Sequence, residues 1–421
     1  MKSIEASPQS GRDIAYTRRQ FLGVGLGAAT ALPFVTATAS LARSQPAETP
    51  APASGRKIRL GVVGCGGRGS WIARLFQQDG GYEMWAVADY FDAVAQSCGD
   101  ALSVDKQRRF SGLSGYKRLI DSGIEAIALE TPPYCFPEHA RAAVAAGLHV
   151  YMAKPVAVDV PGTLSIQDSA KKATAGKKVF LVDYQMPTDP QNIQVVEMIR
   201  AGEIGEIVGI HSHYFAGPFS DPPHTDTLES RFQNLIWCND VALGGGYHNN
   251  ACTHAIQAAL WMAGSRAVAA TGFSTRGRAD AHGDSHDFFQ LAFELENGTT
   301  ISHRGKHLNN LTAFEVVCTA MGKKGFANIV YGGRAFAKGP ENGCSGDVPN
   351  LYEAGAVRNI ARFKKCVLEN NTTNDTVSWA IDSALATILG REAGLRRTSL
   401  TIKDLLLENK SLEVNFRGLK A

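Results

Sequence analysis

Residues 57–76, "KIRLGVVGCGGRGSWIARLF", constrain the fold of this chain more than any other segment. An apolar, β-rich run leads into a cluster of glycines, and a helical pattern of apolar residues follows. Three of the glycines fit the spacing G-x-G-x-x-G, which permits a tight turn and lets backbone N–H groups approach a pyrophosphate at a helix N-terminus. This context predicts a dinucleotide-binding loop. Its expected cofactor contacts are Gly64, Gly66, Gly67, Arg68 and Gly69.

A second strand-like run, residues 82–89, ends in Asp89, which lies twenty residues after Gly69. A carboxylate at that place accepts hydrogen bonds from the ribose hydroxyls and repels a 2′-phosphate. We therefore predict NAD as the cofactor in preference to NADP. The alternative is a glycine-rich turn with an unrelated surface aspartate, which the full order of strand, turn, helix, strand and acid disfavours.

The alternation of strands and helices continues after Asp89. Residues 124–131, "IEAIALET", form a third strand-like run, and residues 137–159 read as a helix, a strand and a Lys-Pro exit. This order predicts a parallel sheet with helices on both faces, whose ligands lie beyond the carboxyl ends of the strands. We therefore expect Thr131, Pro132 and Lys154 to lie beside the glycine loop.

The length of the chain, 421 residues, allows two ordinary domains. Residues 206–215 resemble a strand, and residues 288–307 resemble two strands joined in a hairpin at Asn297-Gly298. A second hairpin is expected within residues 312–331, and two helices near 352–368 and 376–393. We predict an α/β protein with a Rossmann dinucleotide-binding domain over residues 57–180 and a C-terminal α/β domain over residues 181–421.

The N-terminus has the pattern of an export signal. Arg18 and Arg19 precede a Gly/Ala-rich apolar run, which ends in small residues at Ser40-Leu41-Ala42. This pattern resembles a twin-arginine signal peptide over residues 1–42, followed by a flexible Pro/Ala-rich linker over residues 43–56. We expect the protein to be exported by the twin-arginine machinery, for example to the periplasm. The alternatives are an uncleaved anchor and a chance arginine pair.

Composition excludes several classes of function. The formal net charge is +3 and the body of the chain has no long basic run, so we predict no nucleic-acid partner. The eight cysteines form no CxxC pair, and His211 and His213 lack a carboxylate or thiol partner nearby in the sequence. We therefore predict no metal site.

The segment of residues 244–261, "GGGYHNNACTHAIQAALW", carries the most unusual polar pattern of the chain. Asn250 and His254 are four residues apart, which places both side chains on one face if the segment is helical. His248 and Asn249 precede this pair and are candidate substrate contacts, although they also suit simple loop positions.

These pieces together resemble the Gfo/Idh/MocA family of oxidoreductases. The matching segments are the glycine fingerprint, "TPP" (131–133), "AGLHVYMAKP" (146–155), "IRAGEIGEI" (199–207), the segment of residues 244–261, and "ILGREAGLRRTSLTIKDLL" (388–406). The resemblance implies a Rossmann domain followed by an α/β domain with an open, mainly antiparallel sheet. It also implies hydride exchange between nicotinamide and a sugar or cyclitol, and assembly as a dimer or tetramer.

The resemblance also places functional residues, with two departures. The family's lysine maps onto Lys154, but Ala153 stands where the family usually has Glu. The family's Asp and His map onto Asn250 and His254, so an amide replaces a carboxylate. The resemblance also implies an amide near the nicotinamide or the substrate, which maps onto Gln185. Independently of the resemblance, Tyr184 beside it suits a sugar site, and Arg231 and Trp237 suit one as a cationic donor and an aromatic plate.

The chemistry of these side chains suggests their roles. Lys154 can exchange a proton with a substrate hydroxyl, and the positive ring of the oxidised cofactor would lower its pKa. His254 can act as a general base. Asn250 carries no charge, so it can only hydrogen-bond a hydroxyl or the imidazole, and its presence should leave His254 neutral more often.

The function predicted from the sequence is an exported, NAD-dependent oxidoreductase that acts on a carbohydrate. Because export limits exchange of nicotinamide nucleotides, we expect a tightly held cofactor. Two alternatives stay open. One is an NAD-dependent glycosidase that oxidises, eliminates, hydrates and reduces its substrate without net redox change; the other is a non-catalytic sugar- or nucleotide-binding protein.

Overall fold

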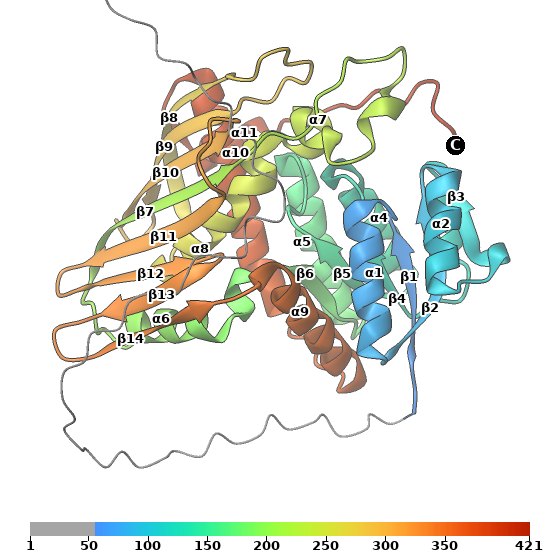
Figure 1. The fold of residues 1–421 in the computed structure, drawn as a ribbon, viewed down its shortest axis with the longest axis horizontal. Helices are drawn as coiled ribbons and strands as arrows, with labels where there is room; N and C mark the ends of the chain where they lie inside the picture. Colours follow the sequence, from blue (N-terminus) through green and yellow to red (C-terminus); the bar gives the residue numbers. More distant parts are fainter. Residues whose placement is uncertain (1–54) are drawn as a thin grey trace, which may run out of the picture. The chain divides into compact units, whose positions relative to one another are not determined.

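The computed structural model describes residues 55–421, so the predicted signal peptide and nearly all of the predicted linker lie outside the described residues. Two sheets organise this part of the chain (Figure 1). None of the helices within residues 55–421 is long and apolar enough to cross a membrane.

The first sheet has six parallel strands in the order β3-β2-β1-β4-β5-β6, which is the strand order of a Rossmann domain. Its strands are β1 (Ile58–Val63), β2 (Tyr82–Asp89), β3 (Arg109–Ser111), β4 (Ala126–Leu129), β5 (His149–Ala153) and β6 (Phe180–Asp183). The helices between them are α1 (Gly67–Asp79), α2 (Asp92–Leu102), α3 (Gly115–Ile120), α4 (Phe136–Ala145) and α5 (Val160–Ala175). The prediction of a Rossmann domain is confirmed.

The second sheet has nine strands in the order β14-β13-β12-β11-β7-β10-β9-β8-β15. Its strands are β7 (Ile207–Ala216), β8 (Ala267–Thr275), β9 (Phe288–Leu295), β10 (Thr300–His307), β11 (Glu315–Gly322), β12 (Phe326–Val330), β13 (Gly333–Lys338), β14 (Gly343–Val348) and β15 (Leu400–Thr401). Every neighbouring pair whose register is described is antiparallel except β7 with β10. The predicted open, mainly antiparallel sheet is therefore confirmed, and both predicted hairpins are present.

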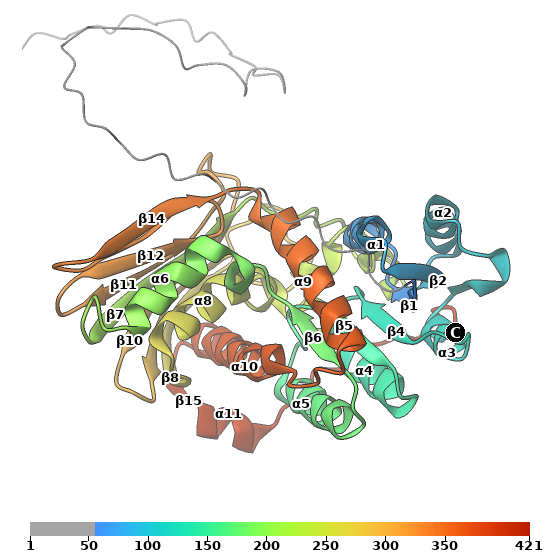
Figure 2. The ribbon, with the colours of Figure 1, turned by 90° about the horizontal axis from the view of Figure 1, so that it is seen from below.

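Helices cover one face of this second sheet. They are α6 (Pro190–Arg200), α8 (Thr253–Ala263) and α10 (Asp375–Arg396), and Figure 2 shows them lying along the sheet. Alternate residues of β9 and β10 are buried and exposed, as expected when one face of a sheet packs on helices and the other meets solvent. The remaining helices are α7 (Val241–Gly244), α9 (Leu351–Leu368) and α11 (Ile402–Glu408).

Helix α9 returns to the first sheet and packs beside α1 (Figure 1). Phe363 of α9 lies in the same apolar core as Tyr151 and Phe76, and the hydroxyl of Tyr82 donates to the carbonyl of Ile360 at 2.8 Å. The core of the Rossmann domain is therefore completed by residues far along the chain. The sixth strand also runs to Asp183, three residues beyond the predicted domain boundary at residue 180.

Candidate active site

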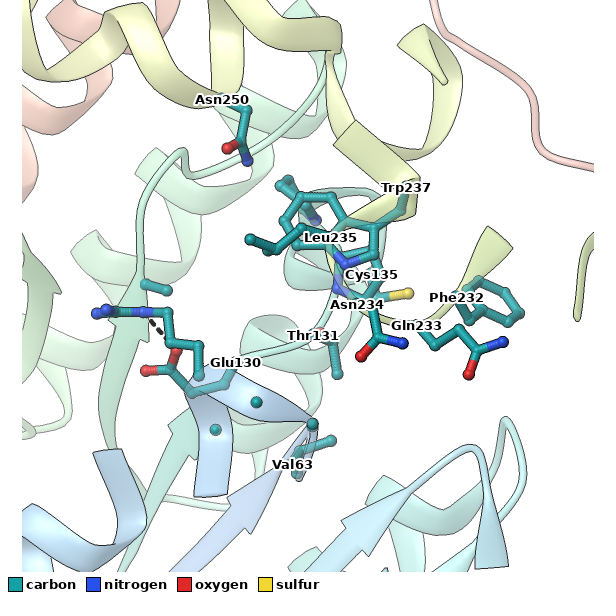
Figure 3. Close-up of a pocket in the computed structure, with 18 of the residues that line it drawn as sticks. Val63, Glu130, Thr131, Cys135, Phe232, Gln233, Asn234, Leu235, Trp237 and Asn250 are labelled. Atoms are coloured by element: carbon teal, nitrogen blue, oxygen red, sulfur yellow. Dashed lines mark ion pairs between the residues drawn. The ribbon is translucent and has the colours of Figure 1, made fainter. Parts of the chain in front are cut away.

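A cavity of about 810 Å³ lies beyond the carboxyl ends of the Rossmann strands, and residues of both domains line it. Strand β1 has β2 on one side and β4 on the other, so the strand order reverses direction at β1. Ligands of doubly wound sheets bind at such a switch point, and the volume is in the range of small-molecule sites. Figure 3 shows Asn250 on one side of the cavity and Glu130 and Thr131 on the opposite side.

The glycine loop has the shape that a bound pyrophosphate requires. Gly64 has a φ of +90°, and a Cβ at this position would lie 2.7 Å from the backbone of Glu130. A Cβ on Gly69 would lie 1.7 Å from the carbonyl oxygen of Gly64. Only glycine fits either position, which brings the N-terminus of α1 close to the loop. Gly66 and Gly67 begin that helix and line the cavity, so free N–H groups of the first turn face the space for a phosphate.

Asp89 ends β2 and lines the same part of the cavity. Its carboxylate accepts hydrogen bonds from the backbone N–H groups of Cys65 at 2.7 Å and Phe91 at 2.9 Å. Burial raises the pKa of this carboxyl, and the two backbone hydrogen bonds oppose that shift. The arrangement holds a carboxylate where a ribose would lie, so the residues fit the adenosine half of NAD.

The three predicted catalytic residues lie together at the other end of the cavity. Lys154 follows β5, and its Nζ donates to the backbone oxygen of Asn250 at 2.8 Å. Burial and the neighbouring guanidinium of Arg68 lower the pKa of Lys154 to about 8. A lysine with this pKa exists in both protonation states near neutral pH, as proton transfer requires.

His254 and Asn250 come from one continuous turn of backbone. A π-helical segment, His248–Cys252, leads directly into α8, and Asn250 and His254 both line the cavity as the sequence predicted. Burial, followed by the charges of Lys154 and Arg68, lowers the pKa of His254 well below its usual value. The direction is the one expected from the sequence, but the causes of the lowered pKa are burial and the neighbouring cations.

Sequence reasoning missed a buried carboxylate in this site. The Glu130 side chain is fully buried, and its Oε2 lies 3.0 Å from Nε of Arg68, the ion pair drawn in Figure 3. Apart from this pair, neither oxygen has a hydrogen-bond partner. Burial raises the pKa of Glu130 to about 7, against the opposing effect of Arg68. Arg68 also pairs with Asp183 at the end of β6.

This carboxylate acts on Lys154 although it comes from a different strand. Ala153 precedes Lys154, whereas Glu130 follows β4, which lies next to β5 in the sheet. The charge of Glu130 raises the pKa of Lys154, so the two groups interact. The signal in the sequence was a charged residue at the carboxyl end of a buried parallel strand.

Four other predicted contacts line the cavity: Thr131, Pro132, Gln185 and Trp237. The Gln185 amide is held in place, because its Nε2 donates to Asp183 at 3.0 Å and its Oε1 accepts from the Tyr331 hydroxyl at 3.2 Å. Trp237 reaches the cavity from the segment before α7 (Figure 3).

Four residues predicted to contact substrate do not line the cavity: Tyr184, Arg231, His248 and Asn249. Tyr184 is 1% exposed, and its hydroxyl lies 2.8 Å from the hydroxyl of Thr253 inside the core. The strand end turns the side chain of Tyr184 inward, so it does not reach the cavity as the sequence led us to expect.

The other three side chains serve the interior as well. Arg231 is completely buried, where it pairs with Asp221 and Asp240 at 2.7 Å each and holds the loop before α7. Asn249 donates to the carbonyl of Ala157 at 2.9 Å. His248 is completely buried on the far side of the π-helical segment. These three side chains lie in the interior and do not reach the cavity.

Comparison with known families matches most of the described chain. Residues 58–182 match the oxidoreductase family with an NAD-binding Rossmann fold, GFO_IDH_MocA. Residues 193–327 match the GFO/IDH/MocA C-terminal domain. The first match assigns NAD to the N-terminal domain, in agreement with Asp89 and the glycine loop.

Curated relatives include inositol 2-dehydrogenases. The chain is 27% identical over 246 residues to inositol 2-dehydrogenase 2 of Saccharopolyspora erythraea, which covers 58% of this chain and 65% of that protein. It is 26% identical over 186 residues to inositol 2-dehydrogenase of Salmonella paratyphi B, which covers 44% of this chain and 53% of that protein. The matched segments therefore span less than two thirds of these relatives.

Solved structures share the fold at lower identity. Levoglucosan dehydrogenase in complex with NADH and levoglucosan superposes with a TM-score of 0.69 at 16% identity, over 82% of this chain and 100% of that chain. Aldose-aldose oxidoreductase from Caulobacter crescentus, complexed with glycerol, gives a TM-score of 0.67 at 17% identity over 82% of this chain and 100% of that chain. With both domains matched in order and an NAD-binding loop in place, this chain belongs to the Gfo/Idh/MocA family of oxidoreductases.

Proposed function

We propose that this protein is an exported oxidoreductase that uses tightly bound NAD to oxidise or reduce a hydroxyl-bearing carbon of a sugar or cyclitol. One observation carries the proposal: a single cavity joins the glycine loop and Asp89 to Lys154, Asn250 and His254. The relatives named as inositol dehydrogenases and the solved levoglucosan dehydrogenase support the substrate class.

The residues of the chain divide the work of the reaction. The glycine loop and Asp89 would hold the adenosine and pyrophosphate of NAD, and Thr131, Pro132 and Gln185 line the way to its other end. When bound, NAD exchanges a hydride with the substrate carbon through its nicotinamide ring.

Lys154 carries the proton. With a pKa of about 8, its neutral form can accept the hydroxyl proton in oxidation, and its ammonium form can return that proton in reduction. The carbonyl oxygen of Asn250 already holds Nζ at 2.8 Å, which fixes the position of the amine. The neutral His254 and the amide of Asn250 supply hydrogen bonds to substrate hydroxyls.

A bound cofactor would be enclosed by the C-terminal tail. The carbonyl of Lys420 accepts from the N–H of Leu113, and its N–H donates to the hydroxyl of Tyr90, two residues that line the cavity. Phe416 stacks near Phe232 of the cavity wall, with ring centroids 6.1 Å apart. These contacts tie the tail to the rim of the cavity and support slow exchange of the nucleotide.

The first experiment identifies the bound nucleotide. The purified full chain is denatured, and the released small molecules are measured by mass spectrometry; we expect NAD or NADH near one per chain. A Phe416→Ala variant should release nucleotide faster during dialysis, whereas Leu407→Ala, which changes an exposed residue of α11, should not. Protein that carries no nucleotide and exchanges added NAD freely would contradict the tightly bound cofactor.

The second experiment measures turnover. Inositols, aldoses and anhydrosugars are supplied singly and in pairs while the absorbance of reduced nicotinamide is followed, because a tightly bound cofactor that one substrate reduces must be reoxidised by a second. Lys154→Met should abolish turnover while the nucleotide is retained, and the exposed-lysine variant Lys171→Met should behave as wild type. Aryl glycosides form a separate arm. Phenol release without net reduction of NAD would replace this proposal with redox-neutral glycoside hydrolysis.

Export and assembly are separate parts of the proposal. Replacing Arg18 and Arg19 by lysine should leave the protein in the cytoplasm, and export of that variant would refute the twin-arginine route.

Exposed apolar side chains on the second sheet, at Val208, Phe273 and Phe326, support a homo-oligomer built on that sheet. Light scattering after size exclusion should report a dimer or tetramer; a monomer would refute it.

A further inference from the structure

A cluster of three buried side chains lies behind the active site: His248, Cys252 and His303. One nitrogen or sulfur atom from each lies within 4.8 Å of those of the other two. His248 and Cys252 are four residues apart on the π-helical segment, and His303 lies on β10. None of the three lines the active-site cavity, so the cluster is separate from the site described above.

The imidazoles of this cluster lack the partners that buried polar groups normally have. Neither Nδ1 nor Nε2 of His248 has a hydrogen-bond partner, although the residue is completely buried. Nε2 of His303 also has none, whereas its Nδ1 lies 2.8 Å from the hydroxyl of Ser212. Since buried polar side-chain atoms are nearly always paired, three unpaired nitrogens in one place indicate a missing partner.

The rings are also held in fixed orientations. His248 stacks on Phe289 with ring centroids 4.7 Å apart, and the hydroxyl of Ser212 fixes His303 through its other nitrogen. Ligating histidines in metal sites are usually oriented in this way, by a hydrogen bond from the nitrogen that does not bind the metal. The geometry is thus prepared for a partner that accepts lone pairs from both imidazoles.

The distances fit a metal ion. Metal–nitrogen and metal–sulfur bonds are about 2.0–2.3 Å long, so the three ligand atoms of a trigonal site lie about 3.5–4.0 Å from one another. The three atoms lie within 4.8 Å of one another, so each needs to move inward by at most about 0.8 Å to reach that geometry. A set of two imidazoles and one thiolate in a trigonal arrangement is typical of copper.

The charges favour a monovalent ion. The guanidinium of Arg391 acts on His248, and its own hydrogen bonds go to the carbonyls of Val158 and Gly245. A divalent ion with one thiolate would add a net positive charge to this buried region, beside a cation. Cu(I) with one thiolate and two neutral imidazoles is neutral overall, and it accepts three ligands without a fourth.

We propose that His248, Cys252 and His303 form a buried three-ligand site for Cu(I). The sequence predicted no metal site, because His303 meets the other two residues only through the packing of β10 against the π-helical segment. The ion would fix that segment from behind, while Asn250 and His254 on its other side face the active-site cavity. Because the site is enclosed, the ion must enter during folding.

The test is the metal content of the purified full chain from cells grown with added copper. We expect elemental mass spectrometry to find about one copper ion per chain. Cys252→Ser should lower that content at least about tenfold. The matched control is Cys318→Ala, which removes another completely buried thiol outside the cluster and should keep the copper.

A second measurement does not depend on variants. X-ray absorption at the copper edge of the wild-type protein should show one sulfur and two nitrogen neighbours, even if Cys252→Ser fails to fold. Wild-type protein without copper, stoichiometric zinc in its place, or a copper spectrum without a sulfur neighbour would overturn the proposal.

Discussion

Lys154→Met tests whether the buried active-site lysine lowers the free energy of unfolding of the protein. The pKa of Lys154 falls from its ordinary 10.5 to about 8, mainly because burial disfavours the ammonium form. Each pKa unit corresponds to about 1.36 kcal/mol, so the protonated lysine lowers the free energy of unfolding by about 3 kcal/mol. Because Nζ lies beside an open cavity and keeps its hydrogen bond to Asn250, we expect Lys154→Met to raise the free energy of unfolding by about 2 kcal/mol.

The dependence on pH has a definite sign. Below pH 8 the lysine is protonated in both the folded and the unfolded chain, so the full cost is present and Lys154→Met is the more stable protein. Between pH 8 and 10.5 the folded chain binds fewer protons than the unfolded chain, so the wild type gains stability relative to the variant. Above pH 10.5 the advantage of the variant is gone.

The assay is urea denaturation of wild type, Lys154→Met and the exposed-lysine control Lys171→Met at pH 7 and at pH 10. Comparison with the wild type cancels the other groups that titrate in this window. An advantage of Lys154→Met that is the same at both pH values, or no advantage at pH 7, would refute the assignment of a lowered pKa.

Four further substitutions address the cofactor and the substrate. Asp89→Asn should weaken the binding of NAD about tenfold, because a carboxylate no longer meets the ribose. The preference for NAD over NADP should also become smaller, and the dissociation constants of the two cofactors measure both effects. Glu130→Gln removes a charge that raises the pKa of Lys154, so the pH midpoint of oxidation should fall. Asn250→Asp adds a carboxylate and should raise that midpoint; an unchanged pH profile would show that position 250 is not coupled to the base. Trp237→Ala should raise KM for the sugar about fivefold or more with less change in kcat, as loss of an apolar contact predicts.

The fold was predictable from local patterns. The glycine loop requires its conformation within a few residues, and the hairpin at Asn297-Gly298 follows from a two-residue turn signal, so both predictions are confirmed by β1–α1 and by β9–β10. Lys154, Asn250 and His254 line one cavity, as their places at a strand end and at helical spacing led us to expect, and their catalytic roles remain predictions.

The errors concern contacts that depend on packing between distant segments. Glu130 was missed because its relation to Lys154 exists only once β4 lies beside β5. Tyr184 and Arg231 were placed in the substrate pocket because their residue types suit sugars. The structure turns both inward, Tyr184 toward Thr253 and Arg231 toward two aspartates, and a single sequence gives no sign of those partners.

The packing of α9 against the Rossmann sheet also sets the order of events during synthesis. Phe363 belongs to the core that β1, β2 and α1 share, so that core stays incomplete until the ribosome has made this residue. At about 5–20 residues per second, the stretch between β6 and Phe363 takes about 10 to 40 seconds to translate. For that time the nascent dinucleotide-binding domain exposes apolar surface that chaperones would have to shield.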